Sequence, residues 1–362
     1  MKILKKPVLT FLLLIAVLAL MLLILPGCSS FGFYKQAIHG QYKILKSRQS
    51  IDKMIADPDT PMDLKEKLNL AMNIRTFAIE TLKLPGQDHY LTYVDVKQPY
   101  VVWAVFAAPK YSIEPKTWCY PIVGCAVYRG YFSKQDAEAY SEQLNNQGYD
   151  VYVSGVKAYS TLGWFDDPVL STFIGRGKTR LAALIFHELA HHIFYVKDDS
   201  TFNESFAQAV EQEGMHRWFI EENNPAAYRK YLDAKNRHKQ FIQLIMKYRH
   251  KLELMYEKEM PVSEKKQHKD QLFNQLRTEY QSLKKKWNGF SGYDEWFNND
   301  LNNAKMITVA AYNDLVPAFL NILESEGRDL ERFYGTCKEL AEKPKEERMV
   351  FLKRYQDGKS NF

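Results

Sequence analysis

Long apolar runs are absent from this sequence after residue 28, and it shows no internal repeat or low-complexity linker. A membrane-spanning helix needs about 20 apolar residues, so residues 29–362 are expected to lie on one side of any membrane. Excess charge is also scarce. The formal net charge is +6, and the first 27 residues contribute three lysines and no acidic residue. The net positive charge that remains is too small to indicate a nucleic-acid partner.

Cysteine is rare as well, with four in 362 residues. Cys28 directly follows the apolar N-terminal segment, which leaves three for the folded part. Cys119 and Cys125 are six positions apart, so they could form a disulfide in an oxidising compartment, with Cys337 left single. The alternative is that all three are reduced and buried, and the sequence alone favours neither state.

Residues 1–27 form a targeting segment, which we expect to be a signal peptide. A basic start precedes an almost unbroken apolar run over residues 8–25, and Cys28 follows a glycine. This junction resembles the processing site of bacterial lipoproteins, which implies cleavage before Cys28 and lipid attachment to it. The alternative is an uncleaved anchor, because about 18 apolar residues can just span a bilayer. Both place the chain in the cell envelope, and Ser29 implies the outer membrane, facing the periplasm, in a Gram-negative host.

The pattern that indicates chemistry is His187-Glu188-Leu189-Ala190-His191, in an apolar segment that favours a helix. Side chains four apart on a helix lie about 40° apart around its axis, so His187 and His191 can bind one metal ion. Glu188 lies beside them, where it can serve as general base toward water at the metal. A catalytic zinc site also needs a third protein ligand and an open position.

Glu204 is the predicted third ligand of Zn²⁺. It comes thirteen residues after His191, in the first turn of a second helix expected to start near residue 201. Thr201-x-x-Glu204 also fits a capping box; if Glu204 only caps its helix, Glu211 or Glu213 would be the ligand. His192 lies about 100° around the helix from His191, so we expect it to pack or face solvent.

These motifs carry a resemblance. The His-Glu-x-x-His run followed by Asn203-Glu204-x-Phe206-Ala207 resembles the gluzincin zinc metallopeptidases. The chain is more closely similar to a bacterial lipoprotein family of predicted aminopeptidases, on residues 163–168, the zinc helix, and residues 302–304 and 316–319. The resemblance implies a zinc-dependent peptidase acting on peptides. Gln208 departs from it, because thermolysin-like enzymes have an aspartate there that supports a zinc-bound histidine, so that partner stays unassigned.

The expected fold class is α+β and mostly helical: a zincin-like metallopeptidase with a small β-sheet beside the zinc helix and a long helical hairpin. Strands are expected at residues 100–108, 122–128 and 149–156, and their sheet edge could pair with an extended peptide. Helices are expected at 41–54, 64–84, 134–146 (with Ser133 as N-cap) and 302–324, the last kinked at Pro317. The expected divisions are a signal peptide (1–27), a lipidated tether with helices (28–85), an α/β zinc-site region (86–224), a helical hairpin (225–290) and C-terminal helices (291–362).

Four further residues are weaker candidates for substrate contact. Asp166 and Asp167 could form a plain turn, or could bind a substrate amino group or orient a zinc-bound histidine. Tyr159 and Tyr312 are candidate donors to the oxyanion of the transition state. The competing function is a non-catalytic envelope lipoprotein whose zinc is structural and which binds a protein or cell-wall partner. A fourth side-chain ligand would favour that alternative, and an open position would favour the peptidase.

Overall fold

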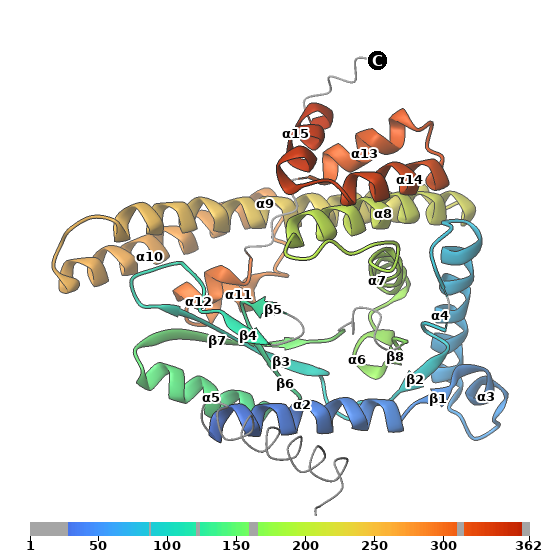
Figure 1. The fold of residues 1–362 in the computed structure, drawn as a ribbon, viewed down its shortest axis with the longest axis horizontal. Helices are drawn as coiled ribbons and strands as arrows, with labels where there is room; N and C mark the ends of the chain where they lie inside the picture. The colour runs from blue at the N-terminus through green and yellow to red at the C-terminus, as the bar shows by residue number, and fades with distance from the viewer. Residues whose placement is uncertain (1–27, 87, 121–123, 159–165, 310–314, 357–362) are drawn as a thin grey trace, which may run out of the picture.

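The computed structural model describes residues 28–86, 88–120, 124–158, 166–309 and 315–356. Helices dominate these residues, and the strands among them form two three-stranded sheets and one two-stranded sheet (Figure 1). The expected mostly helical α+β class is confirmed. Within these ranges, no helix has the length and apolarity needed to cross a membrane.

The N-terminal helices differ from the expectation. The elements are α2 (Cys28–Lys46), β1 (Gln49–Ser50), α3 (Ile51–Ala56) and α4 (Met62–Glu80). A single helix over residues 41–54 is wrong, because Ser50 caps α3 by accepting a hydrogen bond from the Lys53 amide. Gln49 and Ser50 instead pair with β2 (Thr92–Val94). The cap and this strand pairing interrupt a helical pattern that looked continuous.

A small α/β unit follows. Its strands and helix are β3 (Val102–Pro109), β4 (Trp118–Tyr120), β5 (Gly124–Ala126), β6 (Arg129–Tyr131), α5 (Lys134–Asn146) and β7 (Tyr149–Val156). Both β6 and β7 pair antiparallel with β3, so they run parallel to each other and α5 is the crossover between them. The Ser133 side chain caps α5 by accepting from the Asp136 amide, as expected. Of the strand expected at 122–128, the described residues 124–128 contain β5, which pairs antiparallel with β4.

The metal-binding motif lies on the next two helices. The segment runs through β8 (Val169–Leu170), α6 (Ser171–Ile174), α7 (Lys178–Ala190) and α8 (Ser200–Glu221). Strand β8 pairs parallel with β2, and α7 packs against both α8 and α4. The apolar face of α7 is fully buried at Leu181, Ile185 and Leu189. Packing on two sides therefore fixes the rotation of α7 about its axis, which decides where its histidines point.

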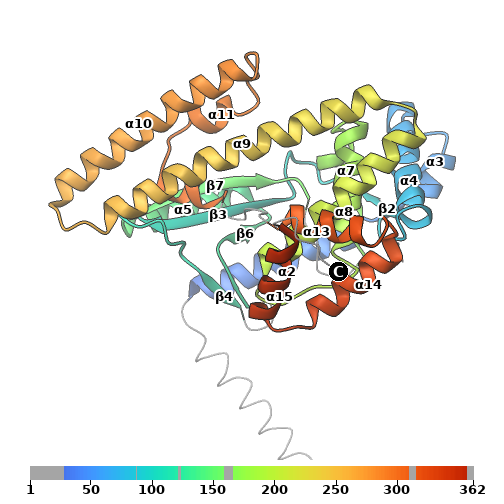
Figure 2. The same cartoon turned by 90° about the horizontal axis from the view of Figure 1, so that it is seen from above.

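The rest of the chain is helical. It comprises α9 (Pro225–Tyr256), α10 (Val262–Lys286), α11 (Asp294–Asn298), α12 (Asn303–Ile307), α13 (Val316–Ser325), α14 (Leu330–Ala341) and α15 (Lys345–Gln356). Helices α9 and α10 form a hairpin with its own apolar core, while α13 packs on α8 (Figure 2). A helix over 302–324 kinked at Pro317 is wrong. Pro317 lies in the first turn of α13, where its missing N–H costs no hydrogen bond.

Candidate metal centre

His187 and His191 project from the C-terminal end of α7. His191 follows the last residue of that helix, yet its backbone angles stay helical, φ −62° and ψ −19°. The four-residue alignment therefore survives to the end of the helix. The Nε2 atoms of the two imidazoles lie 3.2 Å apart.

Glu204, in the first turns of α8, completes the group. Its Oε2 lies 3.2 Å from Nε2 of His187, and its Oε1 lies 3.6 Å from Nε2 of His191. Around a tetrahedral zinc ion with bonds of about 2.0–2.1 Å, neighbouring ligand atoms are about 3.4 Å apart. The three donor atoms thus have the chemistry and the separations that a tetrahedral metal ion requires.

The turn between α7 and α8 is held by the residues around it. Asp199, not Thr201, caps α8, because its side chain accepts from the Phe202 amide. The Asn203 side chain accepts from the Val196 amide at 2.9 Å and donates to the Val196 carbonyl at 2.7 Å. The capping-box alternative for Glu204 is therefore wrong, because the Asp199 side chain caps the helix and the Glu204 carboxylate faces the two histidines.

Glu211 is the partner of His187 that the sequence left unassigned. Its Oε2 lies 3.5 Å from Nδ1 of His187, on the ring nitrogen that faces away from the metal position. Its Oε1 accepts from the Tyr231 hydroxyl at 2.8 Å and from Lys235 Nζ at 3.2 Å. Burial opposes the charged form, but the contacts with His187 and Lys235 lower the pKa of Glu211 to about 2. A charged carboxylate in this place fixes the orientation of a metal-binding imidazole.

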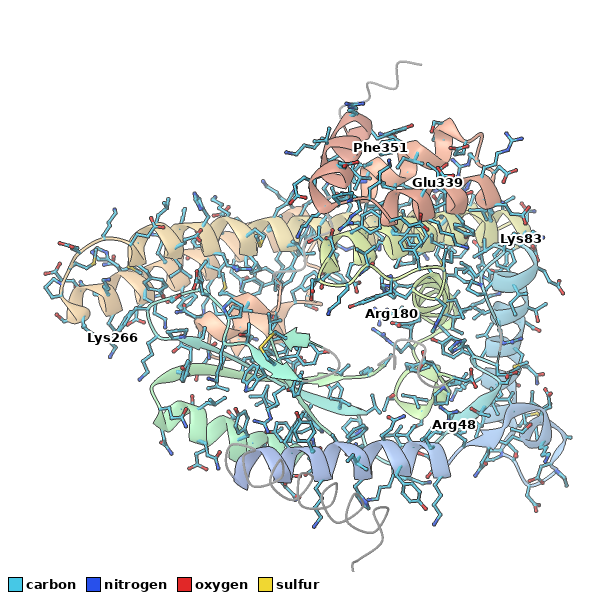
Figure 3. All side chains as sticks on the ribbon, in the orientation of Figure 1. Arg48, Lys83, Arg180, Lys266, Glu339 and Phe351 are labelled. Atoms are coloured by element: carbon cyan, nitrogen blue, oxygen red, sulfur yellow. A yellow bond between two sulfur atoms is a disulfide. The ribbon has the colours of Figure 1, made fainter. Side chains whose placement is uncertain are left out.

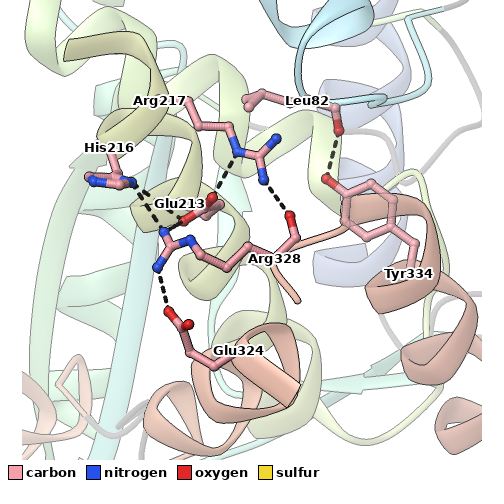
Figure 4. A network of polar contacts seen from close by, with 7 residues as sticks. All are labelled: Leu82, Glu213, His216, Arg217, Glu324, Arg328 and Tyr334. Atoms are coloured by element: carbon pink, nitrogen blue, oxygen red, sulfur yellow. Dashed lines mark hydrogen bonds and ion pairs between the residues drawn. The ribbon is translucent and has the colours of Figure 1, made fainter. Parts of the chain in front are cut away.

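The spacing of Glu211 in the sequence agrees with this position. Glu211 follows Glu204 by seven residues, which is two helical turns, so both side chains lie on the face of α8 that meets α7. Glu213 points elsewhere and belongs to a different network. It is buried and pairs with Arg217 at 2.7 Å and with Arg328. That network, with His216 and Glu324, ties α8 to the end of α13 (Figure 4).

The electrostatics of the centre favour a cation. Burial lowers the pKa of His187, but hydrogen bonds with Glu204 and Glu211 outweigh it and raise that pKa above its usual value. Burial and the neighbouring His187 lower the pKa of His191. Burial also raises the pKa of Glu188, which interacts electrostatically with His187 and Glu204. Two carboxylates therefore stabilise one positive charge at the imidazoles, the place that a metal ion would take.

A second cluster of the same residue types lies next to the first. His89, Asp167 and His192 bring their polar atoms together, and His89 and Asp167 are buried. The rings of His89 and His192 stack with centroids 3.9 Å apart, and Nε2 of His192 lies 3.6 Å from Asp167 Oδ2. Nδ1 of His89 accepts a hydrogen bond from the Asp167 amide at 3.0 Å. His192 thus contacts Asp167 and the His89 ring, which come from segments that the sequence could not connect to it, and these three side chains are a second group that could hold a metal ion.

Of the four weaker candidates for substrate contact, the structure describes the two aspartates. Asp167 belongs to the second cluster, whereas the Asp166 carbonyl accepts a hydrogen bond from Arg48. Tyr159 and Tyr312 lie outside the described residues. Tyr128 is a tyrosine near the centre that the sequence did not indicate: burial, Tyr195 and the Glu204 carboxylate raise its pKa.

The cysteines of the α/β unit are paired. Cys119 and Cys125 form a disulfide across the β4–β5 hairpin, and Cys337 is free and buried. The hairpin lies close to the turn that precedes Glu204, because a Cβ on Gly124 would meet the Asp198 side chain at 3.9 Å. The disulfide therefore stabilises a hairpin that borders the metal centre.

A family model described as putative aminopeptidase matches residues 32–352. The chain belongs to this putative aminopeptidase family. The match contains α7, α8 and both histidine clusters, so the centre lies in the part of the chain that the aminopeptidase family shares. No curated protein and no solved structure matches the chain.

Proposed function

We propose that this protein is a zinc-dependent peptidase of the aminopeptidase type, held in the cell envelope by lipid on Cys28. One observation supports the proposal above all. The donor atoms of His187, His191 and Glu204 lie 3.2–3.6 Å from one another, with the Glu188 carboxylate beside them. Two imidazoles and one carboxylate are the ligand set of catalytic zinc sites.

Each side chain then has a role. Zinc in such a site is a Lewis acid that polarises the peptide carbonyl and makes water nucleophilic near neutral pH. Glu188 accepts the proton of the attacking water and passes it to the leaving amine. Glu211 holds His187 through Nδ1, while Tyr231 and Lys235 hold Glu211. The centre is thus supported by a continuous set of buried contacts between α7, α8 and α9.

The same geometry bears on the non-catalytic alternative. Within the described part of the chain, the group of His187, His191 and Glu204 has three members, and neither Glu211 nor Glu213 joins it. A three-ligand centre leaves a position for substrate or water, as catalytic zinc sites do. This supports the peptidase over a structural zinc site.

The proposal is tested with purified mature protein loaded with zinc. Glu188→Gln should retain one equivalent of zinc and lose about 10²–10⁴-fold in kcat. His191→Ala should lose both zinc and activity. A Glu188→Gln protein that hydrolyses peptides as fast as the parent would refute the mechanism.

Aminopeptidase action is supported by the family and is tested separately. An enzyme that acts at the chain end needs the free ammonium of its substrate, so N-acetylation should abolish cleavage of an otherwise identical peptide. Equal cleavage of the free and the acetylated peptide would show an endopeptidase instead.

The lipid anchor is tested by mass. The wild-type protein should begin at Cys28 and carry the mass of its acyl chains, which together bury enough CH₂ groups, at about 0.8 kcal/mol each, for stable anchoring. Cys28→Ser should remain unprocessed. Recovery of wild-type protein that retains residues 1–27 without added mass would favour the uncleaved anchor.

A further inference from the structure

A cavity of about 720 Å³ opens beside the metal centre, between α7 and the first half of α9. His187 and Glu211 form part of its wall, so the cavity adjoins the centre on the side of His187 that faces Glu211. Cavities of about 300–1,000 Å³ are typical of small-ligand sites. This volume is sufficient for a short peptide, and the side chains that line it define which peptide.

The cavity is strongly basic. Arg176 and Arg180 enter its wall from the start of α7, and Lys230, Lys235 and Arg237 enter from α9. Arg180 extends outward from α7 (Figure 3). Among the described residues that line the cavity, Glu211 is the one carboxylate, and it is already bound to His187, Tyr231 and Lys235.

Most of these cations have no carboxylate partner. Among the described residues, no ion pair involves Arg176, Arg180, Lys230 or Arg237. By contrast, Lys178 lies two residues before Arg180 on α7 and pairs with Glu222. Burial, and secondarily the neighbouring Arg180 charge, lower the pKa of Arg176. Arg237 lies 4.7 Å over the Phe290 ring, and its Nε is buried without a hydrogen-bond acceptor.

Like charges gathered around one concave surface focus a positive potential there, because the protein wall has a low dielectric constant. Guanidinium groups match the planar geometry of a carboxylate. We propose that this cavity binds a carboxylate of the peptide substrate and that the enzyme prefers short acidic peptides. The inference rests on the proposed peptidase function, and it adds the class of substrate. The carboxylate can belong to the C-terminus or to an acidic side chain.

Binding is measured without turnover, so the test does not depend on activity. Zinc-loaded Glu188→Gln protein is titrated by calorimetry with three tripeptides: one with glutamate and a free C-terminus, its glutamine analogue, and its C-terminal amide. At least one neutral analogue should bind tenfold or more weakly than the acidic peptide, and that analogue identifies which carboxylate is recognised. The difference should shrink as ionic strength rises.

Matched variants locate the effect. Arg180→Gln combined with Lys230→Gln should remove the preference, and both side chains are exposed, so folding should not suffer. Lys178→Gln is the control, because Lys178 is on the same helix but pairs with Glu222 and does not line the cavity. Equal affinity for all three peptides, or a preference that survives the double substitution, would overturn the proposal. Either result would leave the peptidase mechanism untouched, which hydrolysis by the wild-type protein tests on its own.

Discussion

Two clusters of similar composition lie side by side at the end of α7, and they differ in which of their side-chain atoms can bind a ligand. Each contains two histidines and one carboxylate. In the first, the Nε2 atoms of His187 and His191 converge on the Glu204 carboxylate. In the second, Nδ1 of His89 accepts a hydrogen bond from the Asp167 amide, and the Asp167 carbonyl accepts one from the Tyr90 amide at 2.7 Å.

The difference teaches that side-chain chemistry alone does not make a metal site. An imidazole nitrogen that accepts a backbone N–H cannot also donate its lone pair to a metal. We therefore interpret the second cluster as structural: it joins the segment around His89 to the segment that leads into α7. In the first cluster, the side-chain atoms of His187, His191 and Glu204 face one another and so remain available to bind a ligand.

The largest difference between the two clusters is expected in metal content when the neighbouring residues His191 and His192 are substituted in turn. His191→Ala should lose its metal almost completely on dialysis, because one of three protein ligands is gone. His192→Ala should retain one equivalent, because its partners are Asp167 and the His89 ring. Elemental analysis of both proteins after dialysis decides, and loss of metal from His192→Ala would show that the second cluster also contributes ligands.

A smaller effect on metal affinity is expected at Glu211, which contacts His187 of the first cluster. Glu211→Gln should weaken metal affinity by about 10–100-fold without abolishing binding, as losses of such supporting carboxylates do. Competition with a chelator of known affinity measures the change. An affinity equal to that of the parent would mean that packing alone orients His187.

The second cluster should affect stability more than metal content. Asp167→Ala leaves the buried His89 and His192 without a carboxylate, at a cost of about 1–3 kcal/mol in the free energy of unfolding. Urea unfolding of the metal-free protein measures it, with Asp166→Ala as the control. Asp166 accepts the Arg48 hydrogen bond through its backbone carbonyl, which the substitution keeps. Equal effects of the two substitutions would contradict a structural role for the cluster.

The smallest effect is expected at Gln208, one turn after Glu204. Thermolysin-like enzymes have a supporting aspartate there, but Glu211 contacts His187 in this protein. Gln208→Ala should therefore change metal affinity less than about twofold, in the same competition assay used for Glu211. A loss as large as that of Glu211→Gln would return the supporting role to this position.

Much of the local structure could be predicted because its causes are local. The spacing of His187 and His191 puts both on one helix face wherever that helix packs. Ser133 caps α5 through an amide three residues away, and strand β7 covers residues 149–156 as its pattern indicates. Predictions failed where a competing local signal was overlooked, as with the Ser50 cap, Asp199 and the N-terminal position of Pro317.

The sequence by itself therefore determined the residue types of the proposed centre, their spacing and the position of the proposed general base. Tertiary structure decided which of two nearby carboxylates supports it: Glu211 meets His187, whereas Glu213 meets Arg328, 115 residues along the chain. It also brought His89 to Asp167, 78 residues away, and gathered cations from α7 and α9 around one cavity. Such contacts depend on how distant helices pack, and the periodicity of a single segment carries no record of its neighbours.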